Sequence, residues 1–336
     1  MPREITFAQA INEALREEMR RDERVYLIGE SVGANDYHMD PTVAGIAKEF
    51  GDARARETGI IEPYIGGSVV GAALAGMRPV ADYMNADYAT LAYDEIFAKG
   101  GLWRYEHGGN GDMGIPLVWR MTIGSYGRGG AEHSRTPTAL FMHGIGFKLV
   151  VPSNAYDAKG LLKTAIRDDN PVVFMEPRAL YRDRAEVPED DYTVPFGVAS
   201  VRRQGSDCTI VAVGFQVKLA LQAAAKLAEQ GVEVEVIDPR TLIPLDIDTI
   251  VGSVRKTGRL VVVDEDVVRC GVHAEIAFQV QEAAFSSLKA PIQRVGNPNL
   301  PIPVSPVLNR EILPSADKIA AAVGLTLGRE VAAGVR

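Results

Sequence analysis

The sequence contains almost no cysteine. Its 336 residues include only Cys208 and Cys270, which lie far apart in the chain. Two distant cysteines encode neither a disulfide framework nor a cluster of thiolate ligands for zinc. We therefore expect neither feature in this protein.

An excess of basic residues is also lacking. Lys and Arg number 36 against 44 Asp and Glu, which gives a net charge of −8. Such a balance provides no positive surface for nucleic acid or an anionic membrane. No apolar run approaches the ~18 residues of a membrane span, and the start, MPREITFAQAINEALREEM, lacks the basic flank and apolar block of a secretory signal. We expect a cytoplasmic protein that binds neither nucleic acid nor membrane.

Several catalytic signatures are absent. The glycines of GGSVVG fit neither the GxGxxG spacing nor the Walker pattern, and no GxSxG nucleophile elbow occurs. A nucleotide-binding enzyme of the doubly wound kind would therefore lack its phosphate loop. The run Asp264, Glu265, Asp266 ends a predicted strand, and we interpret it as a solvated rim.

Patterns of buried strands and helices alternate along the chain. It is 46% hydrophobic and 24% charged, as in ordinary globular proteins, and its length favours two domains. Strands such as RVYLIGES and CTIVAVG alternate with helices such as AYDAKGLLKTAIR, which indicates mostly parallel sheets covered by helices. We predict two doubly wound α/β domains, residues 1–181 and 199–336, joined by an acidic, proline-bearing linker at 182–198.

Four local patterns give further expectations. Thr6 followed by Gln9 predicts a capping box at the start of a helix. The polar stretch 31–56 predicts an excursion over the surface. The glycine-rich segment 124–137 predicts irregular structure, and residues 297–311, with their prolines, predict a loop.

Glu62 stands at the mouth of a run of small apolar residues, in ETGIIEPYIGGSVVGAALAGMRP. If this segment buries it, the loss of hydration favours the neutral acid, which can donate a proton. The alternative is an acid that only interacts with the positive end of a helix, and composition alone favours that role.

His133 lies in GGAEHSR, a glycine-rich loop, two residues before Arg135. A histidine in such a loop can titrate near neutral pH and reach a substrate. A plain surface histidine is the alternative, and these residues leave both open.

Several long motifs occur in one order: TFAQAINEALREEMRRDERVYLIGE, ETGIIEPYIGGSVVGAALAGMRP, GGAEHS, DAKGLLKTAIRDDNPVVFMEP and EVIDPRTLIPLD. Together they resemble the β subunit of the thiamine-diphosphate-dependent 2-oxo acid dehydrogenases, a group that includes the pyruvate, branched-chain and acetoin complexes. The likeness runs from about residue 5 to residue 320. It implies a pyrimidine-binding domain followed by a transketolase C-terminal-like domain.

The resemblance assigns roles to three side chains. Glu62 matches the acid that hydrogen-bonds a ring nitrogen of the cofactor's aminopyrimidine and so favours the imino tautomer, which takes the thiazolium proton. Tyr88 matches an aromatic residue beside the pyrimidine ring, with a core aromatic as the alternative. His133 matches a histidine that positions substrate or intermediate and supports transfer to the lipoyl group.

The resemblance also implies a structural potassium ion, held largely by backbone carbonyls. The residues that match its ligand positions are Leu117, Ala165, Ile166, Asp168 and Asn170.

The magnesium half of the cofactor site is missing from this sequence. Enzymes with this cofactor hold its diphosphate through magnesium on a GDG motif and a later asparagine pair, whereas here GDM at 111–113 breaks the motif and no Asn-Asn occurs. A diphosphate carries too much charge to go unbound. We therefore expect an α partner to supply that half, in an α2β2 assembly. The resemblance further implies a lipoyl acyltransferase core as a partner.

The chain departs from the family's usual residues around the expected site, which leaves the substrate open. The departures are Ser31 in GESVG, Pro63 and Tyr64 after Glu62, Glu132 and Arg135 in EHSR, and Ile145 in HGIG. Arg135 can pair with a substrate anion or with Glu132.

The implied activity is that of a dehydrogenase component with its α partner. It would decarboxylate a 2-oxo acid, or cleave an acyloin such as acetoin, and pass the acyl group to lipoamide. Two alternatives are a transketolase-like or synthase activity with an aldehyde acceptor, and a non-catalytic scaffold subunit of the same fold.

Overall fold

A computed structural model describes residues 3–33, 40–107, 114–125 and 129–329. The chain forms two compact units, the first of residues 1–123 and 143–196 and the second of residues 124–142 and 197–336. The segment that contains His133 therefore belongs to the second unit, although it follows a strand of the first. The GDM motif at 111–113 lies outside the described residues.

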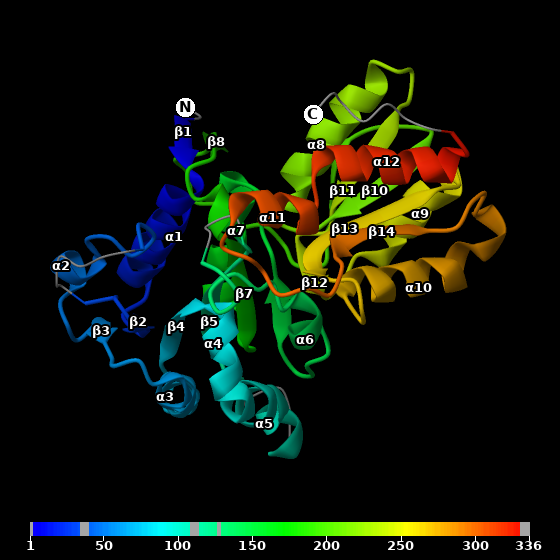
Figure 1. The fold of residues 1–336 in the computed structure, drawn as a ribbon. Coiled ribbons are helices and arrows are strands. Elements are labelled where there is room, and N and C mark those ends of the chain that lie inside the picture. Colours follow the sequence, from blue (N-terminus) through cyan, green and yellow to red (C-terminus); the bar gives the residue numbers. More distant parts are fainter. Residues whose placement is uncertain (1–2, 34–39, 108–113, 126–128, 330–336) are drawn as a thin grey trace. The chain divides into compact units, whose positions relative to one another are not determined.

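The first unit is built on a parallel sheet (Figure 1). Its strands are β1 (Arg3–Thr6), β2 (Val25–Gly29), β3 (Ala55–Glu57), β4 (Arg78–Asn85), β5 (Val118–Ile123), β6 (Lys148–Val150), β7 (Val172–Pro177) and β8 (Arg184–Val187). Its helices are α1 (Phe7–Arg21), α2 (Ile46–Phe50), α3 (Glu62–Leu74), α4 (Ala86–Ala89), α5 (Gly101–Glu106) and α7 (Ala155–Arg167), with 3₁₀ turns η1 (Thr90–Ala92) and η4 (Arg178–Leu180) and the π-helix η2 (Asp94–Gly100).

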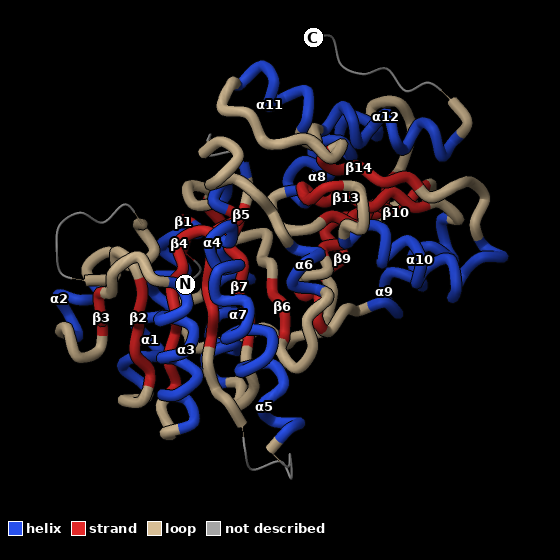
Figure 2. The backbone as a smooth tube through the Cα atoms, turned by 60° about the horizontal axis from the view of Figure 1, so that its bottom comes forward, coloured by secondary structure: helices blue, strands red, loops and turns tan. Residues whose placement is uncertain are grey.

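Six of these strands lie side by side in the order β6-β7-β5-β4-β2-β3, all parallel (Figure 2). Helices α1 and α7 pack against each other, and α3 packs on β4. The carboxyl ends of β2, β3 and β4 therefore meet at one edge of the sheet, next to the start of α3. In α/β proteins this edge is where ligands bind.

The second unit contains a smaller sheet. Its elements are α6 (Thr138–Met142), β9 (Ser200–Arg203), β10 (Cys208–Ala212), α8 (Gln216–Ala228), β11 (Val234–Asp238), β12 (Thr241–Ile243), α9 (Ile247–Thr257), β13 (Leu260–Val267), α10 (Val272–Ala284), η5 (Phe285–Ser287), β14 (Gln293–Asn297), α11 (Pro306–Ile312) and α12 (Ala316–Leu327). The strand order is β14-β13-β10-β11-β9, parallel except for β9. Figure 2 shows α12 on one side of this sheet and α9 and α10 on the other. The predicted fold class is confirmed.

The capping box at the start of α1 is also confirmed. The Thr6 hydroxyl accepts a hydrogen bond from the Gln9 amide at 3.1 Å, and the Gln9 side chain accepts one from the Thr6 amide at 2.9 Å.

Two local expectations were wrong. Residues 31–56 are not only a surface excursion, because they include part of β3, which pairs with β2, and the buried Asp40 and Thr42. Residues 297–311 are not all loop, because α11 begins at Pro306, where the missing amide hydrogen costs no helical hydrogen bond. In addition, the stretch expected as a linker contains β8, which pairs with β1.

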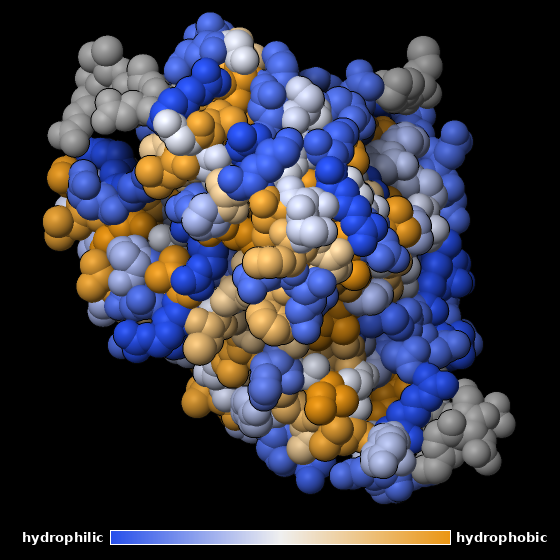
Figure 3. Space-filling model, turned by 90° about the vertical axis from the view of Figure 1, so that its right-hand side faces the viewer, coloured by the Kyte–Doolittle hydropathy of each residue, from blue (hydrophilic) through white to orange (hydrophobic). Residues whose placement is uncertain are grey.

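Apolar side chains remain on the surface of both units. The face drawn in Figure 3 mixes apolar and polar side chains. Among the described residues, the most exposed large apolar side chains are Tyr105 at 90% and Ile60 at 79%. No helix in the described part of the chain is both long and apolar enough to cross a bilayer.

Candidate functional site

Glu62 is the first residue of α3 and is only 4% exposed. The preceding Ile61 offers no side-chain cap, and Pro63 follows in the first turn. A carboxylate here interacts favourably with the helix dipole. Its neighbours Ile60, Ile61 and Tyr64 are nevertheless 79%, 55% and 57% exposed. The acid is thus buried at the base of an exposed apolar rim.

A second acid, Glu30, lies close to Glu62. It directly follows β2 and is half-buried. Burial, together with the negative charges of Glu62, Asp82 and Glu57, raises the pKa of the Glu30 carboxyl to about 7. This group can therefore take up or release a proton near neutral pH. The sequence interpretation missed Glu30, although its place at the end of a buried strand was a usable signal.

Buried polar atoms without partners gather in the same region. Glu30 Oε1, Thr58 Oγ1 and Tyr83 Oη are buried and make no hydrogen bond to any described residue. The Tyr83 phenol has a raised pKa because of burial and the charges of Glu95 and Glu62, which places it near Glu62. Buried polar groups are normally hydrogen-bonded. These atoms and Glu62 therefore fit a polar heterocycle that offers both donors and acceptors.

A cavity of about 760 Å³ opens beside this cluster. Its lining includes the end of β3, the turn before α3 and Tyr64 on the first turn of α3. Thr58 is part of the lining, so the cavity lies next to a residue whose buried hydroxyl has no partner among the described residues.

Two glycines allow the backbone to close around this cluster. A Cβ at Gly29 would lie 2.1 Å from the carbonyl oxygen of Asp82, so β2 and β4 approach too closely for any side chain there. A Cβ at Gly66 would lie 2.8 Å from Tyr83 Oη. The absence of a side chain at Gly66 thus lets α3 pack closely against Tyr83.

Tyr88 is half-buried on α4, immediately after β4. It belongs to the first unit, as Glu62 does. A place beside a pyrimidine ring remains a prediction for this side chain.

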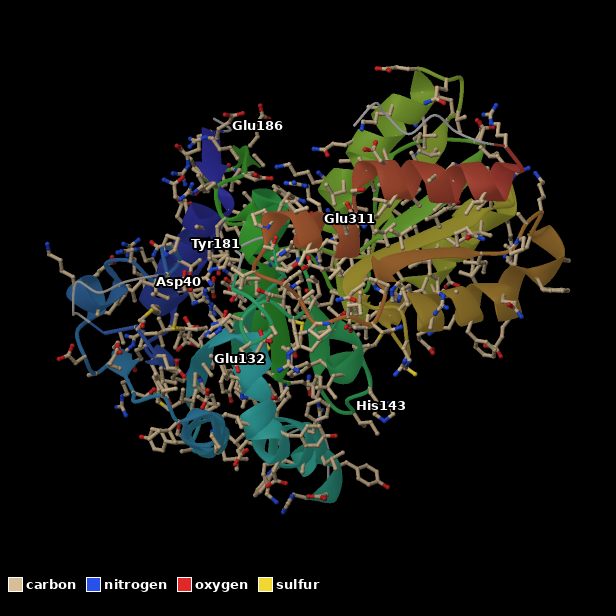
Figure 4. The ribbon with its side chains drawn as sticks, viewed as in Figure 1. Asp40, Glu132, His143, Tyr181, Glu186 and Glu311 are labelled. Carbon is tan, nitrogen blue, oxygen red and sulfur yellow. The ribbon has the colours of Figure 1, made fainter. Side chains whose placement is uncertain are left out.

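His133 lies in an exposed turn of the second unit. Gly130 has φ +72°, and a Cβ at Gly129 would lie 2.6 Å from the carbonyl oxygen of His133, so this turn requires its glycines. Glu132, labelled in Figure 4, is exposed as well. Ser134 is instead 1% exposed, and its hydroxyl has no hydrogen-bond partner among the described residues.

The acidic triplet (Asp264, Glu265, Asp266) holds the segment that contains His133. Glu265 Oε1 accepts hydrogen bonds from the amide of Ser125, at 2.6 Å, and from its hydroxyl. Asp264 Oδ2 accepts from the Thr138 hydroxyl at 2.6 Å. Asp264 and Glu265 are 1% and 5% exposed, so the predicted solvated rim was wrong. The partners are more than a hundred residues away in sequence, which no local pattern could indicate.

Comparisons with known proteins match almost the whole chain. Residues 3–184 match the transketolase pyrimidine binding domain, and residues 197–319 match the transketolase C-terminal domain. The chain is 44% identical over 330 residues to the acetoin:2,6-dichlorophenolindophenol oxidoreductase subunit beta of Bacillus subtilis, covering 95% of this chain and 96% of that protein.

Further relatives carry related names. The 2-oxoisovalerate dehydrogenase subunit beta of B. subtilis is 39% identical and the pyruvate dehydrogenase E1 component subunit beta of Rickettsia felis 42%, each covering 95% of this chain and 97% of the relative. A solved structure titled "Split gene transketolase, inactive beta4 tetramer" superposes with a TM-score of 0.76 at 24% identity, over 97% of this chain and 99% of that one, which shows the shared fold.

The chain belongs to the 2-oxo acid and acetoin dehydrogenase β subunits of the transketolase-like family. This family depends on thiamine diphosphate, and the name β subunit implies an α partner in a larger complex.

The first unit of this β subunit contains a buried charge network that the sequence interpretation missed. Arg120 on β5 donates hydrogen bonds to Glu176 on β7 at 2.8 and 2.9 Å and to Asp82 on β4 at 2.5 Å. Asp40 lies 3.8 Å from the same guanidinium, and Tyr181 donates to Glu176 at 2.8 Å; Figure 4 shows Asp40 and Tyr181 near each other. The network joins β4, β5 and β7, and it therefore fixes the strand that contains Tyr83 and leads to Tyr88.

The residues expected to bind potassium lie at the end of α7 and before β5. Arg78 Nη1 donates to the carbonyl oxygens of Ile166 and Asp168, at 3.0 Å each. The carbonyl of Leu117 accepts from the Val172 amide at 3.0 Å. A cation on the Ile166 and Asp168 oxygens would lie beside the guanidinium charge. This arrangement does not favour an added potassium ion at these two oxygens, and binding of potassium by the five residues stays a prediction from the resemblance.

Proposed function

We propose that this β subunit, together with an α partner, forms a thiamine-diphosphate-dependent component. It decarboxylates a 2-oxo acid, or cleaves an acyloin such as acetoin, and reductively acylates the lipoyl group of an acyltransferase. The observation that carries the proposal is the buried Glu62, which lies near Glu30 and Tyr83 with their unpartnered polar atoms.

Glu62 is the residue that would contact the aminopyrimidine. When bound, thiamine diphosphate supplies a carbanion that attacks a carbonyl carbon. Glu62 would share a proton with a ring nitrogen from its buried position, where water does not compete. Glu30 keeps a second protonatable carboxyl close by, because its pKa is raised to about 7. Tyr88 would lie against the ring face, and His133 would position the substrate or the acyl group during transfer.

The α partner would supply the magnesium and diphosphate half of the site. The absence of a GDG motif and of an asparagine pair supports this division. The exposed Ile60, Ile61 and Tyr64 around Glu62 support it as well, because apolar side chains at a site entrance are suited to burial by another subunit. We expect an α2β2 assembly that docks on a lipoyl acyltransferase core.

The test is reconstitution with the α subunit of the same organism. Thiamine diphosphate and magnesium are titrated into the β chain, the α chain and the mixture, and turnover is measured with pyruvate, a branched-chain 2-oxo acid and acetoin. We expect tight cofactor binding only by the mixture. A lipoyl acceptor and an aldehyde acceptor, supplied separately, distinguish the dehydrogenase from a synthase.

The Glu62→Gln variant distinguishes a catalytic role of Glu62 from a purely structural one. The amide cannot exchange a proton, so we expect kcat to fall by about 100-fold or more while the subunits still assemble. Glu275→Gln is the matched control, since Glu275 is an exposed acid in the first turn of α10. Unchanged turnover in Glu62→Gln would instead support the scaffold alternative.

A further inference from the structure

We propose that the acidic triplet acts as a set of positioning residues for His133, by fixing both ends of the segment that contains it. The inference rests on the proposed role of His133. It extends that role to three carboxylates on a different element, β13, which begins 127 residues after His133.

The hydrogen bonds between Ser125 and Glu265 form the first clamp, which fixes the start of the segment. Ser125 directs both its amide and its hydroxyl to Glu265 Oε1. The other carboxylate oxygen, Oε2, is held by the Gln216 side chain at 3.3 Å. Ser125 and Gln216 are 0% and 1% exposed, so this contact is shielded from water. Hydrogen bonds from a backbone amide to a carboxylate are among the stronger ones in proteins.

The hydrogen bonds that Thr138 and Ala139 donate to Asp264 and Asp266 form the second clamp, which fixes the end of the segment. The Thr138 hydroxyl donates to Asp264 Oδ2 at 2.6 Å, and the Ala139 amide donates to Asp266 Oδ2 at 3.1 Å. Asp264 is itself oriented by the Glu265 amide, which donates to its Oδ1 at 2.7 Å. Consecutive residues of one strand thus hold two points that lie thirteen residues apart.

The base of the segment is closed between these clamps. The Gly124 amide donates to the Arg135 carbonyl at 3.4 Å, so the chain returns to its starting point two residues after His133. Burying Asp264 and Glu265, with the partly buried Asp266 beside them, is unfavourable without compensation. Here, amides and hydroxyls of the His133 segment supply much of that compensation. The histidine itself remains exposed at the tip.

Thr138→Val tests the clamp in the α–β assembly. The change is nearly isosteric and removes one hydroxyl. Thr257→Val is the matched control, because both threonines are 0% exposed and hydrogen-bonded in the second unit, but Thr257 lies before the start of β13. Thr138→Ser keeps the hydroxyl and should restore the wild-type behaviour. The measurements are amide hydrogen exchange of residues 129–137, kcat and KM.

We expect exchange in 129–137 to rise about tenfold in Thr138→Val and kcat to fall by about 10- to 100-fold with little change in KM. Thr138→Ser and Thr257→Val should behave as wild type. Exchange equal to that of Thr257→Val, or faster exchange with unchanged kcat, overturns the proposal. His133→Gln is assayed separately: if it keeps full turnover, the role proposed for His133 fails, whereas the exchange data still report on the clamp.

Discussion

At the scale of single residues, the Glu265 carboxyl is an unusual acid. Burial raises its pKa to about 7, and the charges of Asp264 and Asp266 add to this, whereas the hydrogen bonds from Ser125 oppose it. The folded chain therefore holds a proton there that the unfolded chain, with an ordinary carboxyl, releases near pH 4.5. The contribution of this raised pKa to the free energy of unfolding is fully present below pH 4.5 and is lost as the pH rises through 7.

We predict that Glu265→Gln reduces this loss, because an amide has no proton to release. The difference between the two proteins in their change from pH 5 to pH 8 should amount to about 3 kcal/mol at most. Urea unfolding of the full chain at the two pH values measures it, with Glu275→Gln as the exposed control. A variant with the same pH dependence as wild type would show that Glu265 ionises normally.

The site residues that could be predicted were those that the neighbouring sequence indicates. Glu62 interrupts an apolar run, which left burial and a simple interaction with the helix dipole as the two alternatives, and the structure shows the acid buried. Glu30, Arg120 and the acidic triplet were missed or misinterpreted, because their surroundings come from strands far away in sequence. A charged residue at a strand end looks the same in sequence whether water or a buried serine faces it.

At the scale of elements, the end of α7 is held by a cation that the chain itself supplies. Arg78 donates to the carbonyls of Ile166 and Asp168 and also pairs with Asp169. Free carbonyls at a helix end are favourable places for a positive charge. The guanidinium therefore places a positive charge at these two carbonyls.

We predict that replacing KCl by choline chloride leaves the thermal midpoint of the wild-type assembly unchanged. Arg78→Met should lower the free energy of unfolding by about 1.5–3 kcal/mol, the range for hydrogen bonds to charged groups, and potassium should restore part of this loss. If the thermal midpoint of the wild-type assembly is lower in choline chloride, potassium does bind at this site.

Helices and strands with a clear sequence pattern could be predicted, whereas those without one could not. The capping box of Thr6 and Gln9 at the start of a helix follows from local spacing. Strand β3 was hidden in a polar stretch, since a short edge strand with two exposed residues has no apolar pattern. Helix α11 was hidden by Pro306, which suits a first helical turn as well as a loop.

At the scale of the whole molecule, the rim around Glu62 is the surface to test for the α partner. Ile60 is 79% exposed and lies two residues before Glu62. We predict that Ile60→Asp weakens association with the α subunit at least tenfold, because a charge would be buried at the contact. Ile60→Val is the conservative control. Analytical ultracentrifugation measures the association, and equal affinities would place the partner elsewhere.

The division of the chain into units has a consequence for recombination. Because residues 124–142 sit with the later half, a single crossover near residue 196 does not yield two interchangeable cassettes. A chimera made there would join the Ser125 and Thr138 of one parent to the carboxylates of another. Homologous exchange in this family would therefore preserve function only where these distant partners are inherited together.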